Sequence, residues 1–206
     1  MTRWQRRNSR RGMIIRLNKK RIIIGISGAS GAALGIAALE ILMGLPEWET
    51  HLVMTTGAEL TLAYETDKLP ADVAAMADVA HRIDDLAASI SSGTFVTEGM
   101  LVAPCSMKTA AGVATGYSEN LLLRAADVVI KERRKLVLVP RESPLSPIHL
   151  RNLLSLSELG AVILPPVPAF YQKQRDLSEV VKQVAARALG CFGIDTGLVR
   201  PWTDKE

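Results

Sequence analysis

Aromatic residues, cysteines and histidines are scarce in this chain of 206 residues. Aromatic side chains make up 4% of it, so the core must be built from Leu, Val, Ile and Ala, which suits helices packed on a sheet. The two cysteines, Cys105 and Cys191, exclude a disulfide framework and are typical of a reducing cytoplasm. The three histidines, His51, His81 and His149, lack metal-site spacing, and no paired-carboxylate cluster is present, so we expect no metal.

Long apolar runs are also missing. No stretch approaches the roughly 20 uninterrupted apolar residues of a membrane span, so we expect no membrane-spanning segment. A twin-arginine export signal would need an apolar region after Arg10 and Arg11, and the polar residues 18–21 interrupt it. The sequence therefore predicts a cytoplasmic protein.

Positive charge is concentrated at the amino terminus. Residues 1–20 hold eight Lys and Arg residues and no acid, and removing these eight from the net charge of +4 leaves −4 for residues 21–206. Such a charge block cannot bury enough apolar area to order itself, so residues 1–20 are predicted to be a disordered basic tail. A nucleic-acid binder needs its basic patch on the folded surface, so we expect no nucleic-acid partner. Residues 21–206 are predicted to form one domain.

Short apolar runs alternate with helix-like segments along that domain. The expected strands are 22–27, 51–55, 100–103, 136–139 and 162–164, and the expected helices are 32–43, 58–65, 108–113, 120–132, 146–158 and 177–192. The strand candidates are apolar throughout, as expected of strands that are covered on both faces. The alternation predicts an α/β fold with a mostly parallel sheet. Ligands of such sheets bind beyond the carboxyl ends of the strands.

The first strand ends in a glycine-rich turn. Glycines at 25, 28 and 31 are spaced G-x-x-G-x-x-G, whereas a dinucleotide-binding turn reads G-x-G-x-x-G. The second strand ends at Met54–Thr55–Thr56, which offers no acid to hold a ribose. Both departures argue against NAD. A turn with hydroxyls that opens a helix still makes an anion site and suits a mononucleotide phosphate. Glycines that only pack a helix close to the sheet are the alternative.

The segment 104–109, PCSMKT, forms a second such turn. Ser106 and Thr109 could donate to a ligand where the next helix starts. Cys105 has no neighbouring base in the sequence, so we expect a small buried thiol rather than a nucleophile.

Longer motifs occur in order along the chain: GISGASGA (25–32), HLVMTTGA (51–58), YETD (64–67), ISSG (90–93), PCSMKT (104–109), RAADVVIKERRKLVLVPRESPLSPIHL (124–150) and GAVILPPVPAFY (160–171). In these motifs residues 21–202 resemble the UbiX-type flavin prenyltransferases, including the related small subunits of phenolic-acid decarboxylase systems. The resemblance implies a Rossmann-like three-layer flavoprotein fold, FMN binding and a homododecamer. It implies that dimethylallyl phosphate prenylates reduced FMN at N5 and C6, and that a UbiD-type decarboxylase receives the product.

The resemblance also implies the site residues. The FMN-binding positions are Gly28, Ala29, Ser30, Thr55, Ser106, Met107, Lys108, Thr109 and Arg141, and the expected catalytic residues are Ser30, Glu65 and Glu142. Lys131 and Arg187, with the Tyr171 hydroxyl, would bind the prenyl phosphate and stabilise the charge on it as it departs. Glu142 belongs to the same phosphate site and could protonate the phosphate. Glu65 matches the acid near flavin N5 and could take or relay a flavin proton.

Three other functions are alternatives to flavin prenylation. A peptidyl-cysteine decarboxylase of the same broad group would want an early catalytic His and a P-x-M-N-x-x-M-W segment, and neither is present. A non-catalytic flavin-carrying subunit of an aromatic-acid decarboxylase complex could lose the prenyl-phosphate residues, which are all retained. Direct FMN-dependent decarboxylation fits the same residues. The sequence is also compatible with either of two pathways, ubiquinone synthesis or phenolic-acid breakdown.

Overall fold

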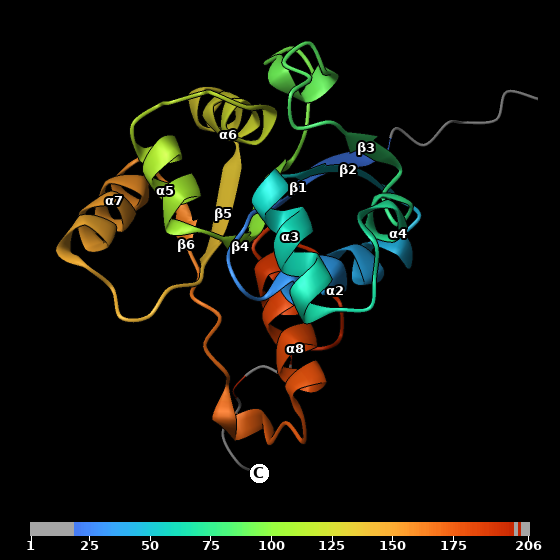
Figure 1. Cartoon of the computed structure of the whole chain (residues 1–206). Coiled ribbons are helices and arrows are strands. Elements are labelled where there is room, and N and C mark those ends of the chain that lie inside the picture. Colours follow the sequence, from blue (N-terminus) through green and yellow to red (C-terminus); the bar gives the residue numbers. More distant parts are fainter. Residues whose placement is uncertain (1–18, 200–201, 203–206) are drawn as a thin grey trace, which may run out of the picture.

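The apolar runs of the sequence form one parallel sheet in the computed structural model, which describes residues 19–199 and 202 (Figure 1). The strands are β1 (Lys20–Ile26), β2 (Trp48–Met54), β3 (Val79–His81), β4 (Gly99–Cys105), β5 (Lys135–Pro140) and β6 (Val162–Ile163). Within the described residues every pairing is parallel, and the order is β3-β2-β1-β4-β5-β6. The order reverses between β1 and β4, so ligands are expected at the carboxyl ends of these two strands.

Helices cover both faces of the sheet (Figure 1). The helices are α2 (Ala32–Met43), α3 (Thr56–Glu65), α4 (Pro70–Ala74), α5 (Met107–Ala114), α6 (Leu121–Lys131), α7 (Pro147–Glu158) and α8 (Leu177–Gly190), with short 3-10 turns η1 (Ser89–Ser91) and η2 (Phe170–Gln172). Residues of α2 and α8 pack in the core on one face, and residues of α5, α6 and α7 pack in the core on the other. The predicted three-layer α/β architecture is confirmed.

Strand β1 shows why the strands are apolar throughout. Ile22, Ile24 and Ile26 point into the core under α2 and α8, and Ile23 points into the core under α5 and α6. Each is buried, and burying one such side chain stabilises the fold by about 1.5–3 kcal/mol. Because both faces are covered, an alternating polar pattern would place polar groups in the core.

The predicted elements differ from the observed ones at short segments and ends. Five strands were expected, and β3 was missed because three residues at the edge of the sheet make no apolar run; α4 has five residues and was missed too. Asn120 and Ser146 were predicted as the first residues of their helices and instead are the caps just before them. Helix α8 ends at Gly190, two residues before the predicted end. Strand β1 begins at Lys20, which the prediction gave to the basic tail, and residues 1–18 of that tail lie outside the described residues. In the described part of the chain, no helix has the length and apolar character to cross a membrane.

Candidate functional site

Three turns meet at the carboxyl ends of β1, β2 and β4. The Ser27 amide donates to the Pro104 carbonyl at 3.2 Å, and the Thr55 amide donates to the Ile26 carbonyl at 3.0 Å. A Cβ atom placed on Gly28 would lie 2.8 Å from backbone atoms of Gly57, so only glycine allows the first two turns to touch. Close packing therefore explains Gly28, which was the alternative interpretation of these glycines. The contact also brings the first two turns to one place at the edge of the sheet.

The PCSMKT turn opens helix α5 as expected. The Ser106 hydroxyl accepts from the Thr109 amide at 3.2 Å and donates to the Thr109 hydroxyl at 3.0 Å, which caps the helix. The first-turn amides of a helix have no partner within it, so this end of α5 offers donors to an anion or a polar ring edge. Cys105 is buried, as predicted, and burial raises the pKa of its thiol to about 12.

The segment after β5 lies beside this turn. The Arg141 amide donates to the Cys105 carbonyl at 3.1 Å, and the side chains of Arg141 and Glu142 are exposed. The positive charge of Arg141 acts on Glu65, which places its guanidinium on the same side as the glycine turn. The structure therefore brings Arg141, Glu142 and Glu65 to the edge where the FMN-binding turns were predicted.

Glu65 occupies the amino terminus of α2. Its Oε2 atom accepts from the Gly31 amide at 2.8 Å and from the Ala32 amide at 2.9 Å. Burial raises the pKa of Glu65, but the Ser30 hydroxyl, these two amides and the Arg141 charge lower it more, so the pKa lies below its usual value of 4.5. The anion site predicted at this helix end is thus filled by a side chain of the protein. In this arrangement Glu65 is a carboxylate and a weak proton acceptor.

Lys131 and Arg187 lie at the opposite edge of the sheet. Lys131 ends α6, four residues before β5 begins, and it pairs with the adjacent Glu132. An Nη1 atom of Arg187 lies 3.7 Å from the Cys191 sulfur, and the Cys191 carbonyl accepts from Lys135 at the start of β5. Since β5 spans roughly 20 Å at about 3.3 Å per residue, both cations are far from Arg141 in one chain.

Tyr171 lies in η2, on the segment that follows β6. Its ring contacts Trp202 edge-to-face at 5.1 Å between centroids. Figure 1 shows this segment extending away from the carboxyl end of the sheet, beside the start of α8. Among the predicted phosphate-binding residues, Glu142 is therefore at the carboxyl edge and Tyr171 lies on a segment that extends beyond that edge, whereas Lys131 and Arg187 lie at the amino edge.

Two features were not foreseen. The rings of His51 and His81 stack, with Nδ1 of His51 at 3.0 Å from Nε2 of His81, and His51 Nε2 contacts Glu49 at 2.9 Å. Burial and the charge of His51 lower the pKa of His81. Within residues 19–199 and 202, no group of three or more potential ligands could hold a metal ion.

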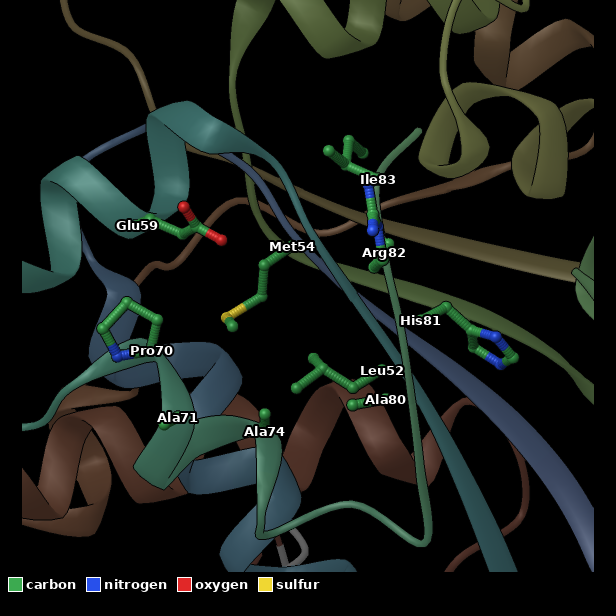
Figure 2. A pocket seen from close by; sticks show the side chains of 10 residues that line it. All are labelled: Leu52, Met54, Glu59, Pro70, Ala71, Ala74, Ala80, His81, Arg82 and Ile83. Atoms are coloured by element: carbon green, nitrogen blue, oxygen red, sulfur yellow. The ribbon is translucent and has the colours of Figure 1, made fainter. Parts of the chain in front are cut away.

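The second unforeseen feature is a mostly apolar hollow of about 280 Å³ between α4 and strands β2 and β3 (Figure 2). Figure 2 shows Leu52 and Met54 facing the short helix α4, with Glu59 at one side. None of the predicted site residues lines this hollow, and it lies away from the β1–β4 switch point. The hollow is therefore separate from the candidate site.

Comparisons with known proteins agree with this geometry. The Flavoprotein family matches residues 15–189. The flavin prenyltransferase UbiX of Neisseria meningitidis serogroup B is 52% identical over 183 residues, which cover 89% of this chain and 96% of that protein. A dodecameric FMN-dependent UbiX-like decarboxylase from Escherichia coli O157:H7 is 52% identical with a TM-score of 0.87, over 89% of this chain and 99% of that one. The structure of AnUbiX in complex with FMN and dimethylallyl pyrophosphate has a TM-score of 0.88 and 50% sequence identity to this chain. The match covers 91% of this chain and 100% of that one.

Proposed function

This chain belongs to the flavoprotein family and, within it, to the UbiX-type flavin prenyltransferases, and we propose accordingly that it transfers a dimethylallyl group from dimethylallyl phosphate to reduced FMN. The observation that carries the proposal is the meeting of the two turns and Arg141 at the β1–β4 switch point. The AnUbiX structure, with FMN and dimethylallyl pyrophosphate, supports the same pair of substrates.

The residues at the switch point fit an anionic flavin. Because Glu65 holds the amides of Gly31 and Ala32 and the hydroxyl of Ser30, the donors for the flavin phosphate are the Thr55 hydroxyl and the amides that open α5. Arg141 adds a positive charge beside them. The remaining predicted FMN positions, Gly28, Ala29 and Met107 to Thr109, lie on the same two turns.

The prenyl-phosphate end of the site is completed by neighbouring copies of the chain. Lys131 and Arg187 lie at the amino edge of the sheet, so they reach the flavin of another copy and not their own. Exposed apolar side chains on α7, among them Ile148 and Leu154, offer surface for contacts between copies. The homo-oligomer is a dodecamer, as the E. coli O157:H7 protein is described to be.

The reaction forms two bonds to the flavin. C6 bonds to the prenyl group when the prenyl C=C bond is protonated and C6 loses its proton. N5 bonds to the prenyl group, and loses its proton, as the allylic C–O bond breaks. The electron pair of the broken bond leaves with the phosphate, and Lys131, Arg187 and the Tyr171 hydroxyl stabilise that growing charge. Glu142, beside Arg141, supplies a proton to the phosphate. Glu65 can take the proton lost from C6 only after its hydrogen bonds from the Gly31 and Ala32 amides, which lower its pKa, have broken.

The product, prenylated FMN, is the cofactor of a UbiD-type decarboxylase, which we propose as the receiving partner. We place the reaction in the cytoplasm, in keeping with the two free cysteines of the described part of the chain.

A mass spectrum of the extracted flavin tests the function. Protein, reduced FMN and dimethylallyl phosphate are mixed without oxygen, and we expect flavin whose mass has grown by one dimethylallyl group less a hydrogen. A parallel sample with dimethylallyl pyrophosphate identifies the donor. A third sample receives an aromatic carboxylic acid in place of the prenyl donor, because the E. coli O157:H7 relative is described as a decarboxylase. Release of carbon dioxide there, with no prenylated flavin in the other samples, would replace the proposal by direct decarboxylation.

A further inference from the structure

Ser27 is a buried polar residue at the end of β1, with 1% of its surface exposed. Its hydroxyl donates to the Pro104 carbonyl at 2.9 Å and accepts from the Ser106 amide at 2.7 Å. Its own amide donates to the same Pro104 carbonyl at 3.2 Å. One small side chain therefore joins the turn after β1 to the turn after β4, across the switch point of the sheet.

The two partners of the hydroxyl matter because of where they lie. Ser106 caps helix α5, so the bond to its amide fixes where that helix begins. The carbonyl of Ser27 accepts from the Ala29 amide at 2.9 Å, so the same residue also shapes the glycine turn. The distance between the glycine turn and the amino end of α5 is thus set through Ser27. Both partners are backbone groups of the turn after β4.

We propose that Ser27 is a positioning residue for the flavin: its hydroxyl sets the spacing of the two turns and thereby the orientation of the flavin held between them. The inference rests on the proposed function of those turns. Ser27 needs no contact with the flavin for this role, because it acts through Ser106 and the glycine turn.

The chain provides a matched control in Thr50, whose side chain is 3% exposed. The Thr50 hydroxyl donates to Asp78 Oδ2 at 3.0 Å and accepts from the Asp78 amide at 2.9 Å, so it too bridges two segments with one donated and one accepted bond. It lies in the first half of β2, away from the turns. Removing either hydroxyl leaves one backbone amide without its partner, that of Ser106 or that of Asp78, because the Pro104 carbonyl keeps the Ser27 amide and Asp78 Oδ2 keeps the Thr50 amide. Only Ser27 borders the candidate site.

The test compares Ser27→Ala with Thr50→Ala in FMN affinity and in the visible circular dichroism of the bound flavin. We expect Ser27→Ala to weaken FMN binding on the order of tenfold and to change the flavin spectrum, and Thr50→Ala to leave both unchanged even if its melting temperature falls as far. Ser27→Thr, which keeps the hydroxyl, restores the spectrum. In prenylation, kcat of Ser27→Ala should fall at saturating FMN.

Equal FMN affinity and an unchanged flavin spectrum in Ser27→Ala would show that the bridge is structural only and overturn the inference. If Ser27→Ala does not fold, Ser27→Cys takes its place, because a thiol has nearly the same shape and is a weak hydrogen-bonding group. FMN binding and its spectrum are measured without prenyl donor. A wild-type protein that binds FMN but never prenylates it would therefore refute the proposed function while leaving the Ser27 result readable.

Discussion

The two edges of the sheet carry their functional groups in different ways. At the carboxyl edge, hydroxyls and amides of Ser27, Thr55 and Ser106 are held by short bonds between turns that are far apart in sequence. At the amino edge, Lys131 and Arg187 are exposed, and the ion pair of Lys131 and the side-chain hydrogen bond of Arg187 are to residues at most four positions away. The carboxyl edge is thus preorganised within one chain, whereas we propose that Lys131 and Arg187 gain their phosphate-binding positions from assembly. The comparison separates residues that the fold of one chain holds in place from residues that, on our proposal, the oligomer places.

The sharpest test of this division is complementation between two inactive variants. Lys131→Ala removes a group of the amino edge, and Glu142→Gln removes a group of the carboxyl edge, so each variant alone should have less than about one hundredth of wild-type activity. Co-expressed in equal amounts, they form mixed oligomers in which one chain supplies an intact carboxyl edge and its neighbour an intact amino edge. With random mixing about a quarter of the sites should be intact. The measurement is prenylation rate per flavin in the purified mixed oligomer.

Two purified variants that are mixed without exchange of subunits serve as the control and should stay inactive. If the co-expressed mixture is also inactive, Lys131 and Glu142 serve the same chain, and the division between the two edges fails.

Arg187→Ala should spare the carboxyl edge and slow the chemistry. Loss of one cation at the departing phosphate costs about 2–4 kcal/mol in the barrier, and part of this should appear as weaker binding of dimethylallyl phosphate. FMN affinity should not change. Arg187→Lys should recover only part of the rate, because lysine lacks the planar fork of donors. Single-turnover prenylation, followed by the absorbance of the reduced flavin, measures both variants.

Lys182→Ala is the matched control, since Lys182 is another exposed cation on α8. It should prenylate at the wild-type rate. Wild-type rate and donor affinity in Arg187→Ala would remove Arg187 from the site.

Gly28→Ala tests the carboxyl edge by geometry. The added Cβ would lie 2.8 Å from the backbone of Gly57, so the two turns must separate. We expect a loss of about 1–3 kcal/mol in unfolding free energy and weaker FMN binding. Gly190→Ala is the control, because its Cβ meets no atom within 4 Å. Denaturant unfolding with and without FMN measures both, and equal stability and affinity for the two variants would contradict the close packing of the turns.

The sequence predicts the carboxyl edge better than the amino edge for a physical reason. Each flavin turn is one contiguous motif directly after an apolar strand, so the parallel sheet alone brings the turns together. The Ser27 bridge and the Glu65 cap were not predicted, because they join residues 77 to 79 and 33 to 34 positions apart.

The family resemblance named Lys131 and Arg187 but not the edge at which they lie. A signal for the edge was present, since a helix that follows a parallel strand returns to the amino edge before the next strand begins. Lys131 stands just before an apolar strand and could have been placed there from the sequence. Which copy of the chain faces it depends on contacts between surfaces, and periodicity within one chain carries no information about those.

The smallest predicted effect is the pH dependence of the Glu65 cap. The pKa of Glu65 is lower in the folded protein than its usual value of 4.5, so the folded state favours the carboxylate. Its contribution to stability is therefore present above pH 4.5 and is lost as the pH falls through the folded pKa. A carboxylate at a helix amino terminus contributes about 0.3–1 kcal/mol, and the lower part of that range applies because the side chain is exposed.

Glu65→Gln keeps the shape of the side chain and removes its charge, so the comparison of melting temperatures isolates the cap. We expect the variant to melt below wild type at about pH 7 and the gap to close at a pH below the folded pKa of Glu65, where the wild-type carboxyl is protonated. Glu40→Gln, on the exposed side of the same helix α2, controls for the loss of one negative charge and should show no such gap. A gap that is equal at both pH values would mean that Glu65 stabilises α2 by packing and not by its charge.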